Sequence, residues 1–82
     1  MTDRDPLLQE REKTHGSFAK NAEIWNALCG VVPVTWCHDN PQKRLALDMI
    51  FLKISRLIQQ PNVKDHFDDI AGYAKLGSEA CE

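Results

Sequence analysis

Side chains suited to binding a phosphorylated ligand fall in three short segments of the chain. One is the turn that contains His15, the second carries Lys53 and Arg56, and the third runs from Asp65 to Tyr73. Lys53 and Arg56 are three residues apart, so on a helix they share a face and could together hold one phosphate or carboxylate. We expect His15 and Tyr73 to contact the base or sugar of a nucleotide bound there.

Carboxylates in the same segments suggest a site for a divalent cation. Asp65 and Asp69 are one helical turn apart, and a third carboxylate from another helix, Asp48 or Glu23, would complete the set. Hard cations such as Mg²⁺ take carboxylate oxygens, and Asp48, Asp65 and Asp69 are our predicted ligands. For Asp48 the alternative is an ordinary surface ion pair with Arg44. For Asp65 and Asp69 the alternative is that they are acidic residues near the start of a helix, where the helix dipole stabilises them.

Composition excludes several other classes of protein. The net charge of the 82 residues is -2, with both signs mixed along the chain, which argues against general nucleic-acid binding. Cys29, Cys37 and Cys81 are odd in number and form no CxxC pair, so we expect a reducing cytoplasm and assign these thiols no role. The histidines show no HxxxH spacing, so a zinc site is not expected. The N-terminus is too charged for a secretory signal, and no apolar run approaches the ~20 residues that a membrane-spanning helix needs.

Proline and glycine signals divide the chain into four expected helices. They cover residues 6–15, a second segment capped by Ser17, residues 41–60 and residues 63–76. The segment 41–60 is apolar over more than half its circumference, so it should be the central helix. Asp5 and Asn40 each precede a proline and should cap the helices that follow. This pattern predicts one small all-α domain, 1–82, resembling a four-helix bundle, with 1–4 and 78–82 flexible.

Three features of this layout need a separate explanation. Residues 30–40 contain Pro33 and Trp36, and we expect an irregular, partly buried connection there because Pro33 disfavours a paired strand. Gly77 should end the last helix. Gly72 lies inside that helix, where glycine costs up to ~1 kcal/mol relative to alanine, so we expect another helix or a ligand to approach it closely. A core this small is marginal, and self-association is the expected remedy.

Three segments together resemble a group of small phage and prophage proteins: 10–18 (EREKTHGSF), 46–58 (ALDMIFLKISRLI) and 65–74 (DHFDDIAGYA). The group's pattern is R…(H/Y)G.F, then AL(E/D)MI..KI.RI, then D.(W/F).DIAGYA. It is distantly similar to the MazG-like all-α nucleotide pyrophosphohydrolases. The resemblance implies an oligomeric helical bundle in a host cytoplasm, with Mg²⁺ held between two helices by an ExxE and an ExxD motif.

This chain departs from the MazG-like metal motifs. Asp65 and Asp68, or Asp65 and Asp69, replace the second motif, but no ExxE exists because Lys13 follows Glu10 and Asn26 follows Glu23 at that spacing. Whether the chain catalyses any reaction therefore stays open.

Three functional hypotheses follow from these patterns. The first is a nucleotide-binding, MazG-like protein, either a Mg²⁺-dependent pyrophosphohydrolase or a degenerate relative. The second is a non-enzymatic anti-defence protein that binds a host protein, a nucleoprotein complex or a nucleotide signal, with Asp65, Asp68 and Asp69 imitating nucleic-acid phosphates. The third is a helical oligomer in which Lys53 or Arg56 merely pairs with Asp69.

Overall fold

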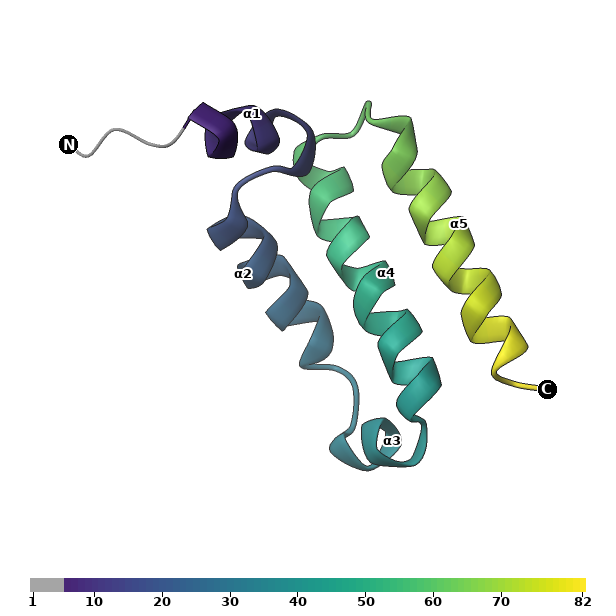
Figure 1. Ribbon diagram of the computed structural model, residues 1–82. Helices are drawn as coiled ribbons and strands as arrows, with labels where there is room; N and C mark the ends of the chain where they lie inside the picture. The colour runs from purple at the N-terminus through teal and green to yellow at the C-terminus, as the bar shows by residue number, and fades with distance from the viewer. Residues whose placement is uncertain (1–5) are drawn as a thin grey trace.

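The computed structural model describes residues 6–82, and all regular secondary structure in that range is helical. The helices are α1 (Pro6–His15), α2 (Phe18–Cys29), α3 (Val34–Asp39), α4 (Pro41–Gln59) and α5 (Lys64–Glu79). Helices α2, α4 and α5 lie side by side with α4 in the middle, while α1 lies at one end of this layer and α3 at the other (Figure 1). The predicted small all-α fold and the central position of 41–60 are both confirmed. Within residues 6–82 no helix has the length and apolar character needed to cross a membrane.

Most predicted helix boundaries agree with the structure. Helix α1 ends before Gly16, whose φ of +74° is the left-handed conformation that glycine adopts most easily. Ser17 caps α2 by accepting a hydrogen bond from the backbone N–H of Lys20 at 3.2 Å. The predictions for Asp5 and for residues 1–4 lie outside the residues that the structure describes.

The prediction of an irregular segment at 30–40 is wrong in its second half, where α3 forms. Pro33 stands at the N-cap with φ −62°, and its carbonyl accepts the N–H of Cys37 at 3.1 Å, so the proline starts a helix. Asn40 is the N-cap residue of α4 as expected, and its carbonyl accepts the backbone N–H of Arg44 at 2.7 Å, but its side chain makes no capping hydrogen bond there. Its side-chain amide instead donates to the carbonyl of Trp36 at 2.9 Å and closes α3.

Both glycines of α5 behave differently from the prediction. Helix α5 continues through Gly77 to Glu79, so the expected stop at Gly77 is wrong. A Cβ on Gly77 would lie 3.4 Å from the Cβ of Ala46, so this glycine marks the close contact of α4 and α5. A Cβ on Gly72 would meet nothing within 4 Å, and the close approach that we expected there is absent.

Few apolar side chains are buried in this layer of helices. Among residues 6–82, Ala46 is the one buried hydrophobic residue. The buried polar side chains are Asn21, Ser55 and His66, and all three serve the junction of α1 with the other helices.

Candidate functional site

The turn between α1 and α2 is held from both sides by buried side chains. The amide of Asn21 donates to the carbonyl of His15 at 2.8 Å. From α5, the buried ring of His66 donates its Nε2–H to the carbonyl of Thr14, which fixes the tautomer of that imidazole. These bonds satisfy carbonyls at the C-terminal end of α1, where helical partners are missing.

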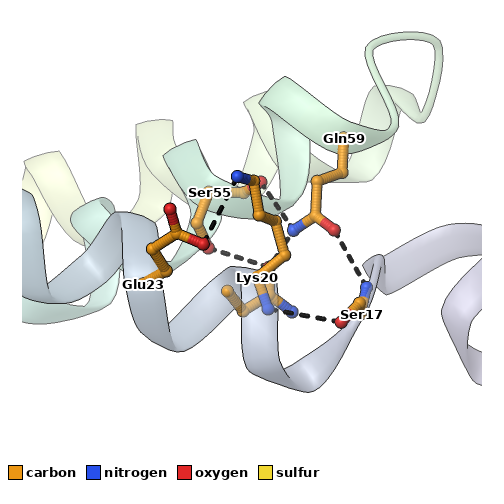
Figure 2. Close-up of polar contacts among 6 residues, drawn as sticks. Ser17, Lys20, Glu23, Ser55 and Gln59 are labelled. Atoms are coloured by element: carbon orange, nitrogen blue, oxygen red, sulfur yellow. Dashed lines mark hydrogen bonds and ion pairs between the residues drawn. The ribbon is translucent and has the colours of Figure 1, made fainter.

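A second layer of hydrogen bonds holds Asn21 itself. Its Oδ1 accepts from Ser55 Oγ at 3.0 Å and from Gln59 Nε2 at 2.7 Å, so α4 contributes both donors. Gln59 Oε1 then accepts the backbone N–H of Ser17 at 2.9 Å, as the dashed lines between the labelled residues show in Figure 2. Every polar group in this small network has a partner, which makes the turn specific and rigid.

Gly16 is the one position of the turn that tolerates no side chain. A Cβ there would lie 2.5 Å from Cδ of Gln59, and the positive φ already disfavours any other residue. The turn can therefore pack its backbone directly against the Gln59 amide. This contact fixes where α1 sits over the C-terminal half of α4.

The fixed position of α1 brings three nitrogen-bearing side chains to one pocket. Arg11 and His15 of α1 and Arg56 of α4 line a hollow of about 430 Å³. The other lining residues come from α1, from the turn after it and from the first turn of α2, and they include one carboxylate: Leu8, Glu12, Gly16, Phe18 and Asn21. The pocket thus carries two guanidinium groups, one imidazole and one carboxylate.

Arg56 is the most constrained of these cations. Burial lowers the pKa of its guanidinium, and the nearby charge of Arg11 lowers it further, while Asp69 and Tyr73 act in the opposite direction. Its Nε is buried and has no hydrogen-bond partner among the described residues. A buried donor without an acceptor costs about 1–3 kcal/mol, so a ligand that supplies an acceptor would be bound favourably.

His15 shares this electrostatic environment. Burial is the main cause that lowers the pKa of His15. A hydrogen bond to the Arg11 carbonyl acts in the opposite direction and raises it, while the charges of Arg56 and Arg11 lower it further. Its Nδ1 lies 2.7 Å from Thr14 Oγ1, and its ring meets the ring of His66 edge to face at 6.0 Å. His15 is therefore neutral near pH 7 and would gain a proton more easily once an anion occupied the pocket.

The expected meeting of α4 cations with an α5 aspartate is present. Lys53 Nζ lies 3.0 Å from Asp69 Oδ2, with the lysine side chain 12% exposed and the aspartate 45%. Arg56 interacts electrostatically with Asp69 and with Tyr73, so these groups lie in one region. The charge of Lys53 is largely satisfied within the chain, as the salt-bridge hypothesis anticipated.

The three carboxylates predicted to hold Mg²⁺ do not converge. Asp48 lies on the side of α4 that faces α2, where it pairs with Arg44 at 3.7 Å and accepts from Cys29 Sγ at 3.8 Å. Asp65 is exposed in the first turn of α5, which is the position expected of an acidic residue stabilised by the helix dipole. In the part of the chain that the structure describes, no three His, Cys, Asp or Glu side chains are grouped so that they could hold a metal. The residues of one chain therefore do not fit this ion.

Comparison with known proteins gives a family but no activity. A family model described as a domain of unknown function, DUF6378, matches residues 3–81. The chain belongs to the DUF6378 family. No match was found among curated proteins or among solved structures.

The DUF6378 domain has a second hollow at the other end of the layer, between α2, α3 and α4. It measures about 370 Å³ and is lined by both tryptophans, Trp25 and Trp36, and by Cys29 and Cys37. Burial, followed by the nearby Asp48, raises the pKa of Cys29. This thiol therefore stays protonated near neutral pH. The hollow is also lined by charged and polar side chains, His38, Arg44 and Asp48.

Several residues that build the site of this DUF6378 domain were missed in the sequence. Arg11 was not predicted as a pocket residue, because the fold of α1 over α4 decides its neighbours. Asn21, Ser55 and Gln59 received no role. The available signal was that Asn21 and Ser55 interrupt otherwise apolar helix faces, where a polar side chain needs a specific partner.

Proposed function

We propose that this DUF6378 domain binds a phosphorylated small molecule, a nucleotide by class, in the pocket between α1, α2 and α4. The observation that carries the proposal is the buried Nε of Arg56, which lacks an acceptor beside a pocket that Arg11 and His15 also line. Planar guanidinium groups bind phosphate oxygens in pairs of parallel hydrogen bonds, and a phosphate would also relieve the repulsion between the two arginines.

The shape and mixed chemistry of the pocket suit a nucleotide better than a bare anion. Its volume of about 430 Å³ falls within the roughly 300–1,000 Å³ typical of small-molecule sites. Leu8 and Phe18 offer apolar surface at its edge, and the carboxylate of Glu12 can accept a hydrogen bond from a sugar hydroxyl or a base N–H. Arg11, His15 and Arg56 then take the phosphate.

The remaining predicted ligand contacts take supporting roles in this proposal. Lys53 forms a salt bridge with Asp69 and so ties α5 to α4. It contributes a positive electrostatic field to the pocket and not a direct contact with phosphate. Tyr73 acts on the pocket through Arg56. Since the carboxylates do not converge, we propose nucleotide binding without a resident Mg²⁺, as in a degenerate MazG-like protein of a phage-infected cytoplasm.

Isothermal titration calorimetry with ATP, ADP, AMP and inorganic sulfate tests the proposal directly. The informative variant is Arg56→Met, and the matched control is Arg44→Met. Arg44 stands on the same helix but pairs with Asp48, away from the pocket. We expect Arg56→Met to raise the Kd for nucleotide at least about tenfold, the equivalent of one charge-assisted hydrogen bond. Arg44→Met should change it less than about twofold.

The same titrations separate the competing readings. Absence of binding by every nucleotide and by sulfate, or equal losses in the two arginine variants, would overturn the proposal. Adding Mg²⁺ should leave the Kd nearly unchanged. A large Mg²⁺-dependent gain in affinity that Asp69→Asn removed would restore the predicted metal site.

A second candidate is the non-enzymatic binding of a host protein. Leu7, Leu8 and Phe18 are exposed around the cationic pocket, which fits a peptide with acidic and apolar side chains. The proposed imitation of nucleic acid by the α5 aspartates is less favoured, because Lys64 pairs with Asp68 at 2.6 Å and another lysine pairs with Asp69. A stoichiometric partner from host lysate that is released by Phe18→Glu, with nucleotide absent, would favour this candidate.

A further inference from the structure

We infer that the hollow between α2, α3 and α4 is a second ligand site, and that it binds a free α-amino acid with an apolar side chain. This hollow lies at the α3 end of the layer of helices, whereas the proposed nucleotide pocket lies at the α1 end (Figure 1). The two cavities share no lining residue. The inference therefore does not depend on the proposed function.

The apolar part of the hollow is built around two indole rings. Trp25 lies on α2 and Trp36 on α3, so the rings come from two different helices. Between residues 6 and 82, neither tryptophan side chain contacts another aromatic ring or donates a hydrogen bond. Val32, Val34 and Leu47 add aliphatic surface to the lining. The indole rings are therefore free to pack against an apolar group of a ligand.

One wall of the hollow carries two opposite charges. Arg44 and Asp48 are one turn apart on α4, and both line the hollow. Arg44 Nε lies 3.7 Å from Asp48 Oδ2, which is longer than the roughly 2.7–3.2 Å of an N–H···O hydrogen bond. The other oxygen of Asp48 accepts from the weak S–H donor of Cys29 at 3.8 Å. The carboxylate and the guanidinium therefore both retain hydrogen-bonding capacity for a ligand.

Partial burial makes the carboxylate the stronger of these two anchors. The side chain of Asp48 is 30% exposed, and that of Arg44 is 56% exposed. Burial, and after it the charge of Asp48, raises the pKa of the Cys29 thiol, so the negative charge of the carboxylate acts inside the hollow. Water and salt screen a charge less there than at the rim. A charged donor should therefore gain more from Asp48 than a charged acceptor gains from Arg44.

The opposite charges select the class of ligand. A simple cation would be attracted by Asp48 but repelled by Arg44, and a simple anion would meet the reverse. A zwitterion satisfies both groups, because its ammonium donates to the carboxylate and its own carboxylate accepts from the guanidinium. An α-amino acid carries these two groups on one carbon atom, which matches two charged groups that are 3.7 Å apart on the wall of the hollow.

The rest of the lining selects an apolar side chain on that amino acid. Beside the charge pair lie the two indole rings and the aliphatic side chains, so an apolar ligand group leaves water when it enters. His38 also lines the hollow, but its side chain is 88% exposed and lies 3.4 Å from Asp39, so it belongs to the rim. The volume of about 370 Å³ is at the lower end of the roughly 300–1,000 Å³ of small-molecule sites, which suits a single amino acid.

Tryptophan fluorescence of the full-length chain reports on this site directly, because both of its tryptophans line the hollow. We expect L-leucine and L-phenylalanine to change the emission saturably, with a Kd below about 1 mM. Two analogues of leucine test the two charges separately, since 4-methylpentanoate lacks the ammonium and leucinamide lacks the carboxylate. Each should bind at least about fivefold more weakly than leucine, the equivalent of one partly screened ion pair.

The informative variant is Asp48→Asn, which removes the charge and keeps the size of the side chain. The matched control is Asp68→Asn. Asp68 also pairs with a cation one turn away, Lys64 at 2.6 Å, but it lies on α5, which contributes no residue from 6–82 to the hollow. We expect Asp48→Asn to raise the Kd for leucine at least about tenfold, the equivalent of one charge-assisted hydrogen bond. Asp68→Asn should change it less than about twofold.

The ligand series separates loss of a contact from loss of folding. Because 4-methylpentanoate has no ammonium, Asp48→Asn should not weaken its binding, whereas a distorted hollow would lose both ligands. If the variant fails to fold, the comparison of leucine with its analogues on the wild type still decides.

Three results would overturn the inference. The first is the absence of a Kd below about 1 mM for both amino acids, by fluorescence and by calorimetry. The second is equal affinity for leucine and either analogue, and with leucinamide this would indicate a peptide N-terminus as the ligand. The third is an equal change of the Kd for leucine in Asp48→Asn and Asp68→Asn.

Discussion

Asn21 is the residue whose replacement tests most directly how the pocket is built. It joins α2 to the α1–α2 turn and to α4 with three hydrogen bonds: to the His15 carbonyl at 2.8 Å, from Gln59 at 2.7 Å and from Ser55 at 3.0 Å. Asn21→Ala removes all three at a position that is 6% exposed. We therefore expect loss of stability together with loss of ligand binding.

The magnitude follows from what each former partner retains. Ser55 Oγ still donates to the carbonyl of Leu52 at 2.6 Å, and Gln59 Nε2 still reaches the carbonyl of Ser55 at 3.2 Å. The carbonyl of His15 is left without this donor in a partly buried turn, and a cavity replaces the amide. We estimate a loss of about 2–4 kcal/mol, from one unsatisfied group and the lost packing. That is a large share of the roughly 4–12 kcal/mol expected for a chain of this length.

Urea denaturation followed by circular dichroism at 222 nm measures this loss. The matched control is Asn26→Ala, because Asn26 is exposed on the same helix and should change the free energy of unfolding by less than about 0.5 kcal/mol. Protein concentration must be the same throughout, since self-association would alter the midpoint. Equal free energies of unfolding for the two variants would refute the reasoning that buried polar bonds hold the turn.

Three other predictions follow from single groups. Gly16→Ala should cost more than about 2 kcal/mol in urea unfolding, because of its positive φ and the glutamine amide beside it, whereas Gly72→Ala should stabilise by up to about 1 kcal/mol. Because the folded pKa of His15 lies below its unfolded value near 6.5, its contribution to stability should be complete above that pH and lost as the pH falls. Its replacement by glutamine should flatten this dependence, while sulfate should bind wild type more tightly at pH 5.5 than at pH 7.5. In alkylation at pH 8, exposed Cys81 should react before Cys29, whose raised pKa suppresses the thiolate, and equal rates would contradict this assignment.

Local signals in the sequence predicted most of the helices because those signals act over a few residues. Prolines that begin helices, the serine at position 17 and the glycine at position 16 each determine the backbone near themselves. The errors arose where distant residues decide. Helix α5 passes through Gly77 because Ala46 on another helix accommodates it, and Gly72 proved to face open space.

The candidate site depended on tertiary structure in the same way. Spacing along one helix correctly indicated that Lys53 and Arg56 lie near α5, and Lys53 pairs with Asp69. Spacing could not show that Asp48 lies apart from Asp65 and Asp69, on the side of α4 that faces α2, where its partners are Arg44 and Cys29. Carboxylates that are close in a sequence pattern converge only when the helices that carry them have the required rotation.

The amino-acid sequence by itself determined α1, α2, α4 and α5, their order and the apolar character of α4, because helix formation depends on near neighbours and periodicity. It did not predict the short helix α3. Only the tertiary structure decided that α1 folds across α4 and that Arg11, His15 and Arg56 share a pocket. The physical reason is that these relations depend on contacts between residues far apart in the chain, such as Ser17 with Gln59, 42 positions apart, and Thr14 with His66, 52 positions apart. Such contacts leave no periodic signal in the sequence.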